Sequence, residues 1–198
     1  MAEVGREIVT RCIDTYHRSI RKLETYKNGM QTMEEYTMLD LERKIEKTIY
    51  KATLALDENN WAAWFELCDE SFTYAITSFS PEINKKMTYF SGDKKELTGL
   101  MDMLPKHNTD HSPLHRHTSV YSIDISDDGK SATAVSSVTI YQNMLDGINS
   151  HLDSGESRLF VIGKYVDEFS IVNGVPKFTN RETQLDNRRL DKGSHWCL

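Results

Sequence analysis

The stretch GKYVDEFSIVNGVPKFTNRETQLD, residues 163–186, is the clearest β-hairpin in the sequence. Asn173-Gly174 separates two strand-like segments, 158–172 and 175–185, and an Asn-Gly pair readily adopts the positive φ angles of a tight hairpin turn. Successive side chains of a strand point to opposite faces, so Tyr165 and Asp167 lie on the same face. The stretch therefore predicts two long antiparallel strands near the end of the chain.

Further strands are expected before this hairpin, because apolar and polar residues alternate or turn-forming residues bound the segments. These segments are 72–76, 83–90, 117–126 and 131–144. A helical pattern interrupts them after Ser91-Gly92-Asp93, and Pro105 is expected to end it.

Three helical segments precede the strands, at residues 4–28, 32–56 and 61–68. The first two carry apolar residues at spacings of three and four, which is typical of amphipathic helices. Helices followed by a helix-interrupted antiparallel meander predict an α+β fold, with a curved sheet wrapped around the N-terminal helices. We expect an N-terminal helical extension over residues 1–30 and one α+β domain over residues 31–198.

The composition is that of a globular protein, with 38% hydrophobic and 27% charged residues among 198. A net charge of -6 and the lack of long basic runs argue against nucleic acid or an anionic membrane as a partner. The N-terminus has no signal-peptide pattern, and no apolar run is long enough to span a bilayer. We therefore expect a cytoplasmic protein whose three cysteines, far apart in sequence, are reduced thiols.

Four stretches together resemble the small β subunits of Rieske-type ring-hydroxylating dioxygenases and related monooxygenases. They are DENNWAAWFELCDESFTYAI at 57–76, SPLHRH at 112–117, the hairpin at 163–186 and the tail RRLDKGSHWCL at 188–198. The resemblance covers about residues 41–198, and the order and spacing of the motifs make it specific. Two features depart from the family pattern: the long first helix, and Pro176 where the return strand usually carries a tryptophan.

The resemblance implies an NTF2-like (cystatin-like) cone and a non-catalytic structural role. In that family a catalytic α subunit holds the Rieske [2Fe-2S] cluster and the mononuclear iron, and three β subunits form a homotrimer within an α3β3 hexamer. The resemblance thus implies no cofactor in this chain, which also lacks the paired short Cys/His motifs that a Rieske centre needs. The substrate of such a complex is an aromatic compound or a small non-aromatic one such as methanesulfonate.

One stretch, HNTDHSPLHRH at 107–117, contains ligand types found in iron sites. The candidate metal ligands are His107, Asp110, His111 and His115. Pro113 argues against the continuous helix that would align these side chains, so a polar loop at a subunit contact is the competing interpretation.

The NTF2-like fold also suggests a second function, that of a free-standing isomerase or dehydratase. Such cones can enclose a pocket in which a buried acid or base works near neutral pH. The residues that could face this pocket are Asp69, Tyr74, His117, Tyr165 and Asp167.

A late cluster of mixed charge is a candidate for ion pairs across a subunit boundary, although an ordinary solvated surface would have the same composition. Its members are Arg181, Arg188 and Arg189, with Asp186 and Asp191.

Overall fold

The structure, a computed structural model, describes residues 37–107, 112–145, 155–188 and 197–198. The chain divides into two compact units, 1–41 and 42–198, and all the described strands belong to the second. The helical extension predicted over residues 1–30 lies outside the described residues.

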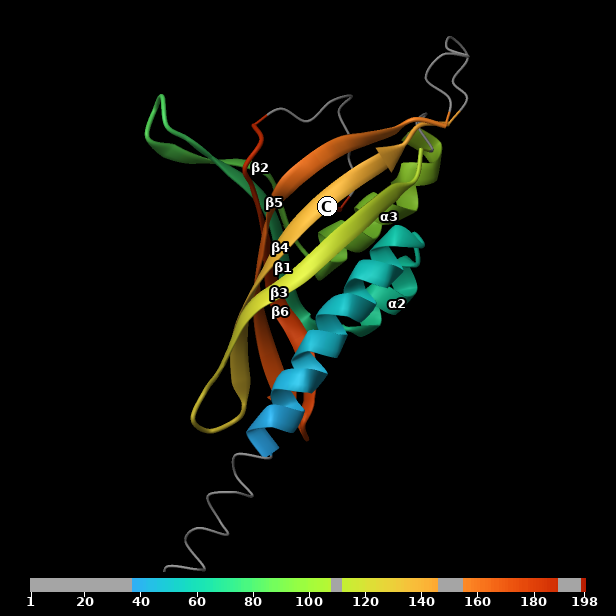
Figure 1. The fold of residues 1–198 in the computed structure, drawn as a ribbon. Coiled ribbons are helices and arrows are strands. Elements are labelled where there is room, and N and C mark those ends of the chain that lie inside the picture. Colours follow the sequence, from blue (N-terminus) through green and yellow to red (C-terminus); the bar gives the residue numbers. More distant parts are fainter. Residues whose placement is uncertain (1–36, 108–111, 146–154, 189–196) are drawn as a thin grey trace, which may run out of the picture. The chain divides into compact units, whose positions relative to one another are not determined.

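Six strands form one sheet in the unit 42–198 (Figure 1). They are β1 (Cys68–Ser80), β2 (Lys85–Asp93), β3 (Leu114–Ile125), β4 (Ser131–Asn143), β5 (Ser157–Val172) and β6 (Val175–Leu185). Their order across the sheet is β2-β1-β6-β5-β4-β3, and neighbouring strands are antiparallel except for the parallel pair β1 and β6. The α+β prediction is thereby confirmed, whereas the parallel pair was not predicted, because it joins strands about a hundred residues apart.

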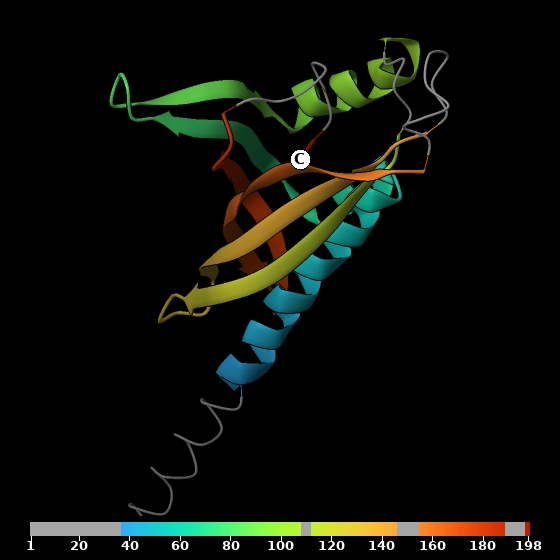
Figure 2. The same cartoon turned by 45° about the horizontal axis from the view of Figure 1, so that its top comes forward.

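The helices that the structure describes lie close to their predicted positions. The first described helix covers residues 37–57, and it is followed by α2 (Trp61–Glu66) and α3 (Lys94–His107). Within the unit 42–198, the first helix runs along one face of the curved sheet (Figure 2), with its apolar stripe buried at Ile45, Ile49, Ala52 and Leu56. The backbone of α3 continues two residues past Pro105, where the sequence predicted its end. A proline this close to the C-terminus removes only one of the last hydrogen bonds of the helix.

Aromatic side chains form much of the core. Trp64 is fully buried, and its ring meets Phe72 and Tyr74 edge-on at centroid distances of 5.7 and 6.0 Å. Phe169 and Phe178 stack at 4.5 Å on the facing positions of β5 and β6. The contacts of Trp64 fix α2 against the sheet.

Two local features hold the β5–β6 hairpin in register. Asn173 and Gly174 both have positive φ, 53° and 70°, as the predicted tight turn requires. Gly163 allows a close approach of the two backbones, because an added Cβ would lie 2.3 Å from the Gln184 carbonyl oxygen. The glycine is therefore required by the strand pairing.

No helix in the described residues is long and apolar enough to cross a membrane.

Candidate functional site

The centre of the sheet contains a buried ion pair between β5 and β6. Asp167 and Arg181 are register partners, and the Arg181 Nε and Nη2 groups donate to the two carboxylate oxygens of Asp167, each at 2.8 Å. Both side chains are 0% exposed. Burial disfavours the charge on Arg181, but the charge and hydrogen bonds of Asp167 outweigh it and raise the pKa of Arg181. Arg181 therefore stays charged, and both Asp167 oxygens accept hydrogen bonds from it.

Two buried tyrosines lie beside this pair. The Arg181 guanidinium stacks over the Tyr165 ring at 4.2 Å. The Tyr74 hydroxyl donates to the Leu198 carbonyl at 3.1 Å and accepts from the Leu198 amide at 2.9 Å and from the Thr183 hydroxyl at 3.3 Å. Burial raises the pKa of both tyrosines, so neither ionises near neutral pH. Tyr74 thus anchors Leu198 inside the domain.

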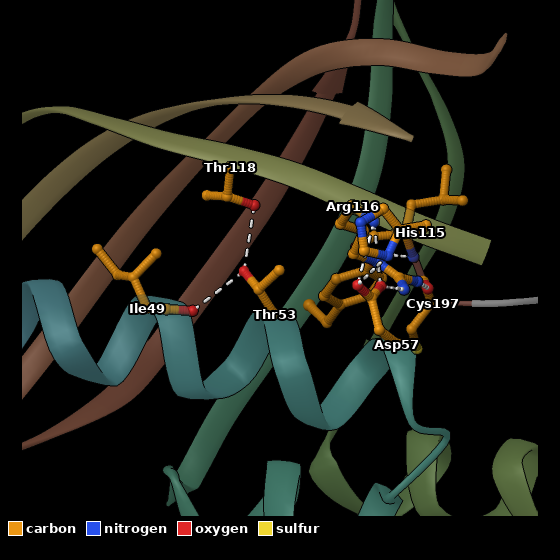
Figure 3. A network of polar contacts seen from close by, with 9 residues as sticks. Ile49, Thr53, Asp57, His115, Arg116, Thr118 and Cys197 are labelled. Atoms are coloured by element: carbon orange, nitrogen blue, oxygen red, sulfur yellow. Dashed lines mark hydrogen bonds and ion pairs between the residues drawn. The ribbon is translucent and has the colours of Figure 1, made fainter. Parts of the chain in front are cut away.

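Arg116 joins three distant parts of the chain (Figure 3). Its Nη1 donates to Asp57 Oδ1 at 2.7 Å, and its backbone amide donates to the same carboxylate at 3.2 Å, at the end of the first helix. Its Nη2 donates to the Cys197 carbonyl at 2.7 Å. One nearly buried guanidinium therefore holds the first helix, β3 and Cys197 together.

The sequence analysis missed Arg116 and Asp57. Asp57 belongs to the acidic turn that ends the helix, and Arg116 stands among histidines in a polar stretch. The available signal was the alternation of β3, because His115 and His117 flank Arg116 and take the exposed face, which turns Arg116 inward.

The predicted catalytic pocket is only partly assembled. Tyr74, Tyr165 and Asp167 all point into the core, as alternation predicted for the last two. His117 is on the outer face of β3, where its ring meets those of His115 and Tyr141 edge-on at 5.0 and 5.6 Å. The prediction that His117 faces the pocket is wrong, because Arg116 takes the inward position next to it.

Asp69 also lies apart from the tyrosines. Its carboxylate accepts from the Ser71 amide and hydroxyl at 3.0 and 2.8 Å and from the Ser170 hydroxyl at 3.3 Å. The hydrogen bonds from Ser71 and Ser170 hold its pKa below the usual value. Asp69 is therefore the second residue of β1 and lies outside the core cluster, so its placement in the predicted pocket is wrong too.

The proposed metal ligands fall largely outside the described residues. Asp110, His111 and the side chain of His107 belong to that part of the chain. His115 is exposed on β3, with its Nδ1 3.4 Å from Asp57 Oδ2. Among the residues that the structure describes, no three His, Cys, Asp or Glu side chains are grouped to hold a metal ion. Metal binding by this stretch therefore stays a prediction.

The predicted interface cluster is divided between core and surface. Arg181 is interior, so its assignment to a surface cluster is wrong: its charge is matched within the chain by Asp167. Arg188 is exposed and forms an ion pair with Glu82 in the β1–β2 turn, which lowers the pKa of Glu82 to about 2. Arg189 and Asp191 lie outside the described residues.

The chain is similar in sequence and in fold to known proteins. The SnoaL-like domain matches residues 37–182. The chain is 54% identical over 154 residues to the β subunit of the methanesulfonate monooxygenase hydroxylase of Methylosulfonomonas methylovora, covering 78% of this chain and 85% of that one. It is 29% identical to the β subunit of 2-aminobenzenesulfonate 2,3-dioxygenase of Alcaligenes sp., covering 76% and 95%.

Solved structures agree with the fold. The β subunit of an aromatic-ring-hydroxylating dioxygenase from Novosphingobium aromaticivorans superposes with a TM-score of 0.59 at 21% identity, covering 74% of this chain and 90% of that one. The predicted NTF2-like fold is confirmed. The chain belongs to the SnoaL-like family, among the β subunits of the hydroxylase components of ring-hydroxylating dioxygenases and related monooxygenases.

Proposed function

We propose that this chain is the structural subunit that assembles with a catalytic α subunit, in a hexamer of three α and three β subunits. The observation that carries the proposal is the 54% identity to a hydroxylase β subunit over 85% of its length. The Rieske cluster and the mononuclear iron are assigned to the α subunit, and the complex to the cytoplasm.

The described residues do not fit a Rieske cluster. Such a centre needs two cysteine and two histidine ligands. Cys68 and Cys197 are buried free thiols, and burial raises the pKa of each to about 12, whereas His115 and His117 are on the outer face of β3. This donor set supports placing the cluster in the partner.

The core geometry also favours a structural role over independent acid–base catalysis. A general base needs a free lone pair within reach of a substrate proton. Both oxygens of Asp167 accept hydrogen bonds from Arg181, and neither side chain is exposed. Asp167, the buried carboxylate on which the isomerase or dehydratase alternative depends, is therefore already engaged by Arg181.

We propose a small alkanesulfonate, such as methanesulfonate, as the substrate of the assembled complex. Both relatives named above carry a sulfonate in their names, and the one named for methanesulfonate is the more similar, at 54% against 29% identity. The substrate would bind to the α subunit, so this chain supports the activity by assembly.

Reconstitution tests this proposal. The chain is co-expressed with the α subunit of its own organism, and oxygen uptake is measured with reductase and NADH. We expect uptake that depends on methanesulfonate and on the presence of this chain, and that is lower with 2-aminobenzenesulfonate. Stable assembly with uptake only on the aromatic sulfonate would overturn the substrate, and absence of assembly would overturn the function.

A further inference from the structure

On one edge of the Arg116 guanidinium, only one of the two N–H groups has a hydrogen-bond partner. The Nε and Nη2 groups of an arginine form a two-pronged edge that matches two oxygens of one oxyanion. Arg181 uses this edge fully on Asp167. In Arg116, Nη2 donates to the Cys197 carbonyl, whereas Nε is buried without a hydrogen-bond partner. The Cys197 carbonyl oxygen therefore binds alone to an edge of Arg116 that could bind two oxygens of one oxyanion.

Neighbouring donors are also unmatched. The Tyr165 hydroxyl is buried beside the Arg116 guanidinium and interacts with it, but neither this hydroxyl nor Arg181 Nη1 makes a hydrogen bond of good geometry. Buried polar groups normally have partners, and exceptions often indicate an ion, a water molecule or a ligand. All three unmatched groups can donate, which favours a ligand rich in acceptor oxygens.

We propose that Arg116, Tyr74 and Tyr165 form an interior binding site for a small organic oxyanion, a carboxylate or a sulfonate, and that Cys197 and Leu198 occupy this site when it is empty. Two oxygens of the ligand accept from Arg116 Nε and Nη2, and the tyrosine hydroxyls supply further donors. Asp57 balances the charge of Arg116, so recognition rests on directed hydrogen bonds rather than on net charge. The proposal concerns this chain alone and does not depend on the function proposed above.

Displacement of Cys197 and Leu198 from the site can be measured directly in the full chain. Cys197 is 2% exposed, so a thiol reagent modifies it only when the tail leaves. Cys68 is equally buried, with its thiol donating to the Trp64 carbonyl, but it is close enough to Cys197 for the two groups to interact, so circular dichroism at the same salt concentrations reports general unfolding. Mass spectrometry of the digested protein measures the modification of each cysteine separately.

The experiment compares acetate, methanesulfonate and sodium chloride at equal ionic strength. We expect acetate, methanesulfonate or both to raise the modification rate of Cys197 at least tenfold with saturation, while the circular dichroism spectrum stays unchanged. Faster modification of Cys197 with acetate alone identifies a carboxylate site, and with methanesulfonate alone a sulfonate site. Equal rates in all three salts, or acceleration that accompanies loss of the circular dichroism signal, would overturn the site.

Two variants connect the effect to the site. Arg116→Lys keeps the charge but removes the two-pronged edge, and we expect it to abolish the saturable acceleration. Tyr165→Phe removes only an unpaired hydroxyl, so the fold is kept, and we expect half-saturation at a concentration several-fold higher. Tyr141→Phe, on the outer face of β4, is the matched control and should behave as the unmodified chain. An unchanged saturation curve in Tyr165→Phe would contradict its role as a ligand donor even if Arg116→Lys does not fold.

Discussion

Arg181 donates from Nε and Nη2 to the two carboxylate oxygens of Asp167, across register partners of β5 and β6, and neither side chain reaches solvent. This pairing places a carboxylate in the core of the domain and makes it unavailable as a base. The interior of the domain is thus organised as a structural core, in keeping with a subunit that supports a catalytic partner.

Asp167→Asn should destabilise the chain strongly, because it leaves the Arg181 charge buried with no counter-charge. Removal of one partner of a buried pair typically costs about 3–5 kcal/mol of the free energy of unfolding. Urea denaturation followed by circular dichroism measures the change. The double variant Asp167→Leu with Arg181→Met removes both charges and should lose much less.

The ion pair of Glu82 with Arg188 is the matched exposed control. Both side chains are in solvent, where an ion pair contributes little. Glu82→Gln should leave the urea midpoint nearly unchanged. Equal midpoints for Asp167→Asn and Glu82→Gln would show that the buried pair has no special role.

Gly163→Ala should disrupt the β5–β6 pairing, because the added Cβ would lie 2.3 Å from the Gln184 carbonyl oxygen and the backbone would have to move. Overpacking of this kind typically costs about 1–3 kcal/mol. Gly99→Ala in α3 adds the same methyl group with nothing within 4 Å. Since alanine is the better helix former, that control should gain up to about 1 kcal/mol. Two variants of equal stability would contradict the close approach.

Alkaline pH should weaken the fold through the buried thiols. Burial raises the pKa of Cys197 from 9.0 to about 12, so the folded chain keeps a proton that the unfolded chain releases. Its contribution is complete below pH 9 and is lost as the pH rises from 9 toward 12, at up to about 1.4 kcal/mol per pH unit. Urea midpoints between pH 8 and 10 measure this slope, and Cys197→Ala should reduce it by about half, because the pKa of Cys68 is raised in the same way. A slope that Cys197→Ala leaves unchanged would contradict the assignment.

Local patterns predicted most of the fold. Alternation located the strands, and the Asn173-Gly174 turn set the β5–β6 hairpin, because these signals depend on neighbours in sequence. The parallel pairing of β1 with β6 depends on contacts between segments about a hundred residues apart. No local pattern encodes such a contact.

The site was less predictable for the same reason. Charge alone suggested a surface position for Arg181, although its partner Asp167 is across a strand pair. Asp57 and Arg116 are 59 residues apart, and their pairing required the helix to lie against β3. His117 was misplaced by one position in the alternation, which moves a side chain to the opposite face of the sheet.

The composition of the native complex tests the central claim most directly. The chain is tagged and purified from its own cells, and native mass spectrometry and iron analysis are performed on the intact assembly. We predict three copies of this chain with three copies of a larger subunit, and iron that stays with the larger subunit after the two are separated. A stable assembly of this chain alone, or iron that stays with it, would contradict the account.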